Sequence, residues 1–306
     1  MAFFSGNTTM DALVDKLADE LIATGAWGTA DATLVAGASP AKRAVQHLTD
    51  ASFFVTIERI LSSVGNVRYN EIKVRVSTGF DTALHVPSGT VEVTGIPAEG
   101  WQSNNTSIAN YDGSSTGTNK SGTYYLWVDA AGIAVLATWA PVSNHFDFTS
   151  ALFIERITTK EYADGYSNFF VAAWTNADSA LYTGSTASGY FRSTAFDLQR
   201  KQGIRPFSGT TTDNYTTMLE TFFGAYRSPG NSKIYLQFPY FSNTTASPQR
   251  TPIAQSKKFF LVALGVGLGD GDTVNVVVGA ETWTYLVKTL QSPESTNYLS
   301  VAIRQA

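Results

Sequence analysis

Two apolar runs joined by a tight connection at residues 124–139 constrain the fold of this chain more than any other feature. The segment reads YYLWVDAAGIAVLATW, and Asp129 and Gly132 hold the first and fourth positions of the connection, which suits a type I turn. The sequence therefore predicts a β-hairpin. Both faces of its second run are apolar or small, so we expect the hairpin to lie inside an assembly and to serve packing rather than catalysis.

The composition indicates a globular protein with an unusually uncharged surface. The chain has 306 residues, 43% of them hydrophobic and 13% aromatic, which is ample for one large β domain or two ordinary domains. Charged residues make up 15%, against roughly 25% in an average soluble domain. Such a surface can lie against another protein without the desolvation of many charges.

Charge and residue usage argue against several classes of function. The net charge is −4 and the 21 Lys and Arg residues are scattered, so we expect no nucleic-acid partner. The chain has no cysteine, which excludes disulfides and thiolate chemistry. No signal peptide is readable at the N-terminus, and the longest apolar run falls well short of the about 20 residues of a membrane helix. We therefore expect synthesis in the cytoplasm and no membrane insertion.

One amphipathic helix is predicted over residues 9–24. Asn7 or Thr8 can cap its start, and Gly25 can end it. Its apolar side chains recur at intervals of three and four, so we expect it to pack on a sheet; they are Met10, Leu13, Val14, Leu17 and Leu21. The segment over residues 39–48 opens with Ser39-Pro40 and is compatible with either a helix or a strand.

Beyond residue 52 the apolar pattern alternates and predicts strands. A second hairpin is expected from residues 53–57 and 72–76, with a turn at 65–66. A short helix is expected over residues 214–226. Further strands are predicted over residues 152–157, 169–174, 233–238, 259–266, 273–278, 282–287 and 298–303.

These patterns predict a mainly β fold: a β-sandwich-like domain with an N-terminal α-helix and long loops. We divide it into a helical segment over residues 1–30 and a single β-rich domain over residues 31–306, with loop insertions near 98–123 and 175–257. The first insertion is polar, rich in glycine and without period. The candidate interface residues are Trp101, Tyr111, His145 and Phe191.

The histidines show no spacing typical of a metal site. His47, His85 and His145 lie far apart and have no HExxH-like partner. Asp147 follows His145 at a distance that places both on one face of a strand and can orient its imidazole, although a satisfied core or interface histidine is the favoured interpretation. We predict no metal and no cofactor.

Two groups of carboxylates suggest a catalytic site and a calcium site, and in each case a structural interpretation is favoured over the functional one. Glu155 with Glu161 and Asp164 can be read as a pair for glycoside cleavage, but charged strand ends and loop residues are the simpler interpretation. Asp270 and Asp272 flank a glycine in a short turn that suggests calcium. The turn lacks the other ligands of a calcium loop, so a hairpin turn is favoured.

Four segments, taken in order, resemble a family of virion structural proteins from tailed bacteriophages. They are the start over residues 1–27, YNEIKVRVSTGFD over 69–81, YYLWVDAAGIAVLATWAP over 124–141, and GVGLGDGDTVNVVVGAETWTYLVKTL over 265–290. The middle, over residues 175–249, matches no part of that family that we can place. The resemblance implies a non-enzymatic subunit of the phage particle and assigns no catalytic residue.

The leading hypothesis is a structural subunit that forms a ring at the neck, tail or baseplate of a tailed phage. Its expected partners are copies of itself and other virion proteins, and its expected place is the virion, assembled in the host cytoplasm. The alternative is a surface binding module, either a capsid decoration or a host-receptor adhesin, suggested by the aromatic loop over residues 100–111. A depolymerase enzyme is a third class, and it requires clustered carboxylates in a cleft.

Overall fold

In the residues that it describes, the computed structural model is mainly β with an N-terminal helix, which confirms the predicted fold class. It describes residues 1–64, 67–102, 119–139, 146–147, 149–156, 169–175, 190–195, 202–204, 236–237, 240–243, 252–255, 258–262, 268–278, 280–290 and 299–306. The predicted helix over residues 214–226 and the predicted turn at 65–66 lie outside these residues.

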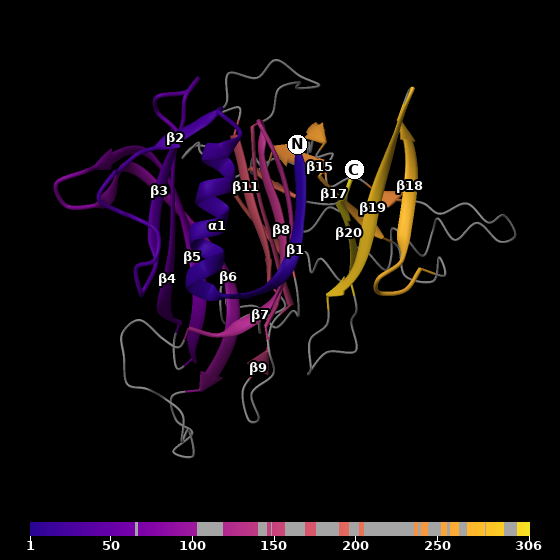
Figure 1. The fold of residues 1–306 in the computed structure, drawn as a ribbon, viewed down its shortest axis with the longest axis horizontal. Coiled ribbons are helices and arrows are strands. Elements are labelled where there is room, and N and C mark those ends of the chain that lie inside the picture. The colour runs from indigo at the N-terminus through magenta and orange to yellow at the C-terminus, as the bar shows by residue number, and fades with distance from the viewer. Residues whose placement is uncertain are drawn as a thin grey trace, which may run out of the picture.

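The predicted hairpin over residues 124–139 is confirmed, and it lies within a six-stranded antiparallel sheet, here the central sheet (Figure 1). Asp129 pairs with Gly132, so only Ala130 and Ala131 form the turn. The strands, in spatial order, are β1 (Ala2–Thr9), β7 (Ser121–Asp129), β8 (Gly132–Trp139), β10 (Thr149–Arg156), β11 (Phe169–Thr175) and β12 (Tyr190–Ala195).

A second six-stranded antiparallel sheet, here the outer sheet, contains the other predicted hairpin. Its strand β4 pairs with β5 along the whole length of β4, and the ambiguous segment after Pro40 is the strand β3. In spatial order the strands are β2 (Trp27–Thr29), β3 (Lys42–His47), β4 (Phe54–Val64), β5 (Val67–Asp81), β6 (Val86–Gln102) and β9 (Phe146–Asp147).

Helix α1 (Met10–Ala23) lies between these two sheets, in contact with β3 and β4 on one side and with β7 and β8 on the other (Figure 1). The cap is Thr9, the last residue of β1, whose hydroxyl accepts a hydrogen bond from the Ala12 amide; the expected caps Asn7 and Thr8 lie one and two positions earlier in the strand. Gly25 follows the helix with φ of 73°, as expected of a C-terminal stop. The apolar face of the helix is fully buried.

The main core joins the helix to both sheets. Leu13 and Leu17 of the helix belong to the same apolar cluster as Ile72 of the outer sheet and Val135 of the central sheet. Beyond the helix, β6 lies directly against β10, β11 and β12. The arrangement is a β-sandwich with a helix between its layers.

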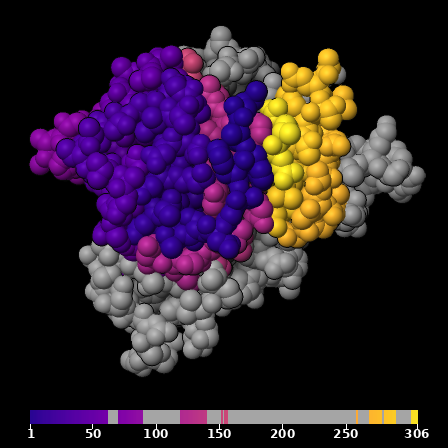
Figure 2. Space-filling view, in the orientation of Figure 1, coloured from indigo at the N-terminus to yellow at the C-terminus, as the bar shows by residue number. Residues whose placement is uncertain are grey.

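A five-stranded antiparallel C-terminal sheet covers the other face of the hairpin. Figure 2 shows its yellow and orange surface directly against the indigo and magenta part of the molecule. In spatial order it consists of β14 (Leu236–Gln237), β17 (Phe259–Val262), β20 (Leu299–Arg304), β19 (Glu281–Leu290) and β18 (Thr273–Val278). A small sheet consists of β13 (Gln202–Ile204), β15 (Tyr240–Asn243) and β16 (Pro252–Gln255).

Burial of both faces of the hairpin is achieved within this chain. Leu126 and Val135 face the helix, whereas Trp127, Ala134 and Leu136 lie on the opposite face and are also buried. Strand β20 contacts β7 and β8 on that side. The C-terminal sheet supplies this second cover, so burial of the hairpin needs no second subunit, and its place inside an assembly stays a prediction.

Both predicted loop insertions contain strands. Strand β6 continues to Gln102 and β7 begins at Ser121, so Trp101 lies in a strand and pairs with Arg68. The glycines and the two prolines of β6 hide its alternation, and its long partner β5 supplies the backbone hydrogen bonds. Within residues 175–257, β14 lies inside the strand predicted over residues 233–238, whereas β12, β13, β15 and β16 were not predicted, because β12 lacks apolar alternation and the other three have at most four residues. Strand β1 at the N-terminus was likewise not predicted.

We predict that Gly132→Ala strongly destabilises the fold. Gly132 has φ of 148°, and an added Cβ would overlap the carbonyl oxygen of Ile154 on the adjacent strand. We expect a loss of about 3 kcal/mol or more in the free energy of unfolding, measured by urea denaturation.

The matched control is Gly25→Ala. Gly25 also has positive φ, but an added Cβ would meet nothing within 4 Å, so the cost should be only about 1 kcal/mol. Equal losses in the two variants would contradict the steric argument.

Candidate functional site

A buried lysine joins the C-terminal sheet to the turn of the central hairpin. Lys258 precedes β17 and is 3% exposed, and its Nζ lies 2.9 Å from the Asp129 carboxylate and 3.2 Å from Oε1 of Glu155. Asp129 is the last residue of β7 and pairs with Gly132 of β8. Glu155 lies in β10, on the other side of β8, and also pairs with Gly132. The three residues form a lysine–carboxylate cluster at one end of the central sheet.

The two carboxylates of this cluster are held differently. Asp129 accepts hydrogen bonds at Oδ1 from the amides of Ala131 and Gly132, at 2.9 and 3.1 Å, and at Oδ2 from the Trp127 indole at 3.3 Å. In contrast, Oε2 of Glu155 is buried and has no hydrogen-bond partner within the described part of the chain. Asp129 is thus fixed by its turn, and Glu155 keeps an unused acceptor.

Burial and charge act in opposite directions on Lys258. Burial lowers the pKa of its ammonium group, but Glu155 and Asp129 outweigh that effect and raise the pKa above its ordinary value. Lys258 is therefore charged at rest, in a site where an unpaired charge would be costly.

Aromatic side chains surround the same junction. The guanidinium carbon of Arg304 lies 4.8 Å from the ring centre of Trp127 and 4.3 Å from that of Trp283, so one cation joins an indole of each sheet. Tyr285 is fully buried, and burial raises the pKa of its hydroxyl, which stays protonated. These rings limit the access of water to the junction.

Sequence reasoning found only part of this cluster. Glu155 was a candidate carboxylate, but its proposed companions Glu161 and Asp164 lie outside the described residues. The sequence predicts for Asp129 only the first position of the hairpin turn. Lys258 is separated from Asp129 by 129 positions, and no local pattern around it indicates a site.

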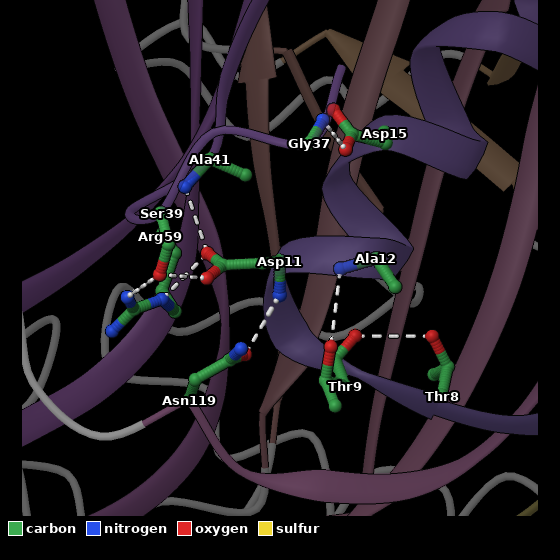
Figure 3. A network of polar contacts seen from close by, with 10 residues as sticks. All are labelled: Thr8, Thr9, Asp11, Ala12, Asp15, Gly37, Ser39, Ala41, Arg59 and Asn119. Atoms are coloured by element: carbon green, nitrogen blue, oxygen red, sulfur yellow. Dashed lines mark hydrogen bonds and ion pairs between the residues drawn. The ribbon is translucent and has the colours of Figure 1, made fainter.

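A second buried charge anchors the start of the helix (Figure 3). Asp11 accepts hydrogen bonds from Nε of Arg59 at 2.6 Å, from the Ala41 amide at 2.7 Å and from the Ser39 hydroxyl at 2.7 Å. Its own amide donates to Oδ1 of Asn119 at 3.0 Å. Burial raises the pKa of Asp11, but these donors outweigh it and hold the pKa below its usual range. All of these partners belong to the chain, which indicates a structural role.

His47 is a buried histidine with satisfied polar atoms. Its ring lies edge-on to Trp27 with centres 4.8 Å apart, and its Nδ1 accepts a hydrogen bond from the Thr49 amide at 3.3 Å. Burial lowers the pKa of His47, with a further contribution from Arg156. The neutral ring therefore packs as part of the core.

His85 lies on the surface in a polar group with Asp31 and Thr33. Its Nδ1 is 2.7 Å from Oδ2 of Asp31 and 3.2 Å from the Thr33 hydroxyl. The Thr33 hydroxyl, followed by His85, lowers the pKa of Asp31 to about 2. Because hydroxyl and carboxylate share one ring nitrogen, the group lacks the geometry of a nucleophile–histidine–carboxylate relay.

The acidic turn before β18 already has protein partners. Asp270 pairs with Lys288 at 2.7 Å, and Asp272 accepts a hydrogen bond from the Gly269 amide at 2.6 Å. The turn leads into β18 and does not connect β18 to β19. Across the described ranges, no group of three His, Asp or Glu side chains is placed to hold a metal ion.

The four candidate interface residues are only partly covered by the structure. Trp101 belongs to β6 and Phe191 to β12, two strands that contact each other. Tyr111 and His145 lie outside the described residues.

Two edge strands carry no charged side chain. Strand β1 is an edge of the central sheet with sequence AFFSGNTT, and β18 is an edge of the C-terminal sheet with sequence TVNVVV. Neither contains a proline. Val277 of β18 is 72% exposed, among the most exposed large apolar residues described.

Comparison of the chain with models of protein families and with curated proteins gives no match. Among the described residues, the helix is too short and too polar to cross a bilayer.

We predict that Asp11→Ala costs about 3–5 kcal/mol of unfolding free energy, because it removes the buried carboxylate that accepts from Arg59, the Ala41 amide and Ser39. The control is Asp19→Ala on the same helix. Asp19 pairs with Arg43 but is 54% exposed, so its loss should cost at most about 1 kcal/mol. Urea denaturation of both variants measures the difference, and similar costs would contradict the anchoring role of Asp11.

We also predict that His47 makes the fold sensitive to mild acid. Its folded pKa is below the unfolded value of 6.5, so the unfolded chain binds the proton first as the pH falls, and stability present above 6.5 is lost below it. The unfolding temperature should fall between about pH 7.5 and about pH 5, and less steeply in His47→Gln. An unchanged slope in His47→Gln would refute the assignment.

Proposed function

We propose that this chain is a non-enzymatic structural subunit of a tailed bacteriophage particle. In this proposal it assembles through strand edges and loops into a ring at the neck, tail or baseplate, with copies of itself and other virion proteins as partners. The observation that carries the proposal is the pair of uncharged edge strands β1 and β18.

Such edges are unusual in a protein that works alone. An edge strand presents unpaired backbone amides and carbonyls, and monomeric proteins protect it with lysine, proline, bulges or a covering element. Strand β18 has none of these residues and exposes Thr273, Asn275 and Val277 on one face. A neighbouring subunit that covers this edge would satisfy the backbone and bury Val277.

The charge distribution supports the same proposal. The charged clusters at Asp11 and Lys258 are buried and engaged with the chain's own residues, which suits the joining of layers within a rigid subunit. The low charge of the whole sequence lets surfaces pair without the desolvation of many ions. The order of the four segments that resemble virion proteins is a further support.

We predict that Val277→Lys weakens self-association. A lysine on the edge strand stays solvated and opposes strand pairing, so the dissociation constant should rise about tenfold or more, equivalent to about 1.4 kcal/mol. The measurement is the mass in solution by light scattering over a range of concentrations.

The control is Leu84→Lys, at a residue 69% exposed in the turn between β5 and β6. It should leave the association unchanged. A strictly monomeric wild-type protein that binds host cells or glycans would favour the surface binding module. Normal, infectious particles assembled without this protein would overturn the structural role.

A further inference from the structure

The lysine–carboxylate cluster brings a primary amine against a carboxyl carbon in a site with little water. Nζ of Lys258 is 2.9 Å from each oxygen of Asp129, so it faces the carboxylate symmetrically. It approaches Glu155 through Oε1 at 3.2 Å. Side-chain exposure is 3% for Lys258 and 11% for Glu155. Such fixed proximity of reacting groups is what turns a slow bimolecular reaction into a feasible intramolecular one.

We propose that Lys258 and Asp129 join in an amide bond between Nζ and Cγ, with Glu155 as the group that carries the protons. The bond would link the end of β7 to the segment that leads into β17. This modification site is independent of the proposed role in a virion.

The reaction balances without any cofactor. The ammonium of Lys258 gives a proton to Glu155, which passes it to Oδ2 of Asp129, and the free amine attacks Cγ. The new C–N bond forms, the nitrogen loses a second proton through Glu155, and the bond from Cγ to Oδ2 breaks. Oδ2 leaves as water with both protons, and Glu155 ends as the carboxylate with which it began.

The hydrogen bonds around Asp129 match the needs of this reaction. The amides of Ala131 and Gly132 both donate to Oδ1, where negative charge develops when the amine adds to Cγ. Oδ2, on the side of the Trp127 indole, is then the oxygen that departs. The Asp129 side chain is 18% exposed, which gives the water a route out.

Glu155 has the features of a proton carrier. Its Oε1 contacts the amine, and its buried Oε2 has no hydrogen-bond partner within the described residues, so no other donor holds the carboxylate in one role. The ion pair with Lys258 is the resting state, and the first proton transfer must precede attack. The reaction occurs once per molecule and therefore needs no high rate.

The product removes a buried ion pair from the structure. Charges withdrawn from water carry a desolvation cost that ion pairing repays only in part, whereas an amide is neutral. The link also ties residues that are 129 positions apart, in a chain whose lack of cysteine excludes disulfides. It would fix the C-terminal sheet on the central sheet.

The decisive experiment is mass spectrometry of the intact, denatured wild-type protein. We expect a mass lower than that of the sequence by one water molecule. After digestion, a branched peptide should join the segments around Asp129 and Lys258, and trypsin should not cleave after Lys258. A full sequence mass with both peptides linear would overturn the proposal.

Variants test the role of each group in the same measurement. Lys258→Arg keeps a cation but removes the nucleophilic amine, and Glu155→Gln keeps the size but removes the proton carrier. Both should show no loss of water. Lys288→Arg, at the lysine paired with Asp270, is the matched control and should lose water like the wild type.

A further variant tests which atom is attacked, and the measurement itself separates the bond from assembly. Asp129→Asn should lose ammonia in place of water if Cγ is the site of attack; loss of water from this variant would place the bond elsewhere and refute the assignment. Because mass is read on the denatured single chain, failure of the amide bond leaves the proposed ring untouched, and failure of the ring leaves the bond untouched.

Discussion

Burial of the β7–β8 hairpin on both faces is the constraint on which the other layers depend. An apolar strand pair of this kind is stable only when both faces are covered. Helix α1 and the outer sheet cover the face that includes Leu126 and Val135, and the C-terminal sheet covers the face that includes Trp127 and Leu136. The order of layers follows: outer sheet, helix, central sheet, C-terminal sheet (Figure 1).

Buried charges set how these layers are placed relative to one another. Apolar contacts alone are not directional, whereas Asp11 with Arg59, and Lys258 with Asp129, each allow one arrangement of their elements. The net stability from such pairs is small, but the loss of one partner is costly. An amide bond at Lys258 would turn the second of these contacts into a covalent one.

A rigid interior and uncharged edges have complementary roles in the proposed subunit. The interior layers are held together by the chain itself, so assembly need not complete the fold. In the proposed assembly the edges β1 and β18 would pair with neighbours, and their lack of charge would keep the desolvation cost of pairing low. A subunit that carries load in a particle gains from a C-terminal sheet that cannot detach.

Local sequence determined the hairpin, helix α1 and the strand over residues 273–278, because each has a periodic apolar pattern with a turn or cap beside it. It did not determine β1 or the strand that contains Trp101, whose backbone partners are distant in sequence. It also did not reveal Lys258, since a buried ion cluster depends on where three separate segments meet. Periodicity is a local property, whereas pairing and charge burial are decided only when the layers pack.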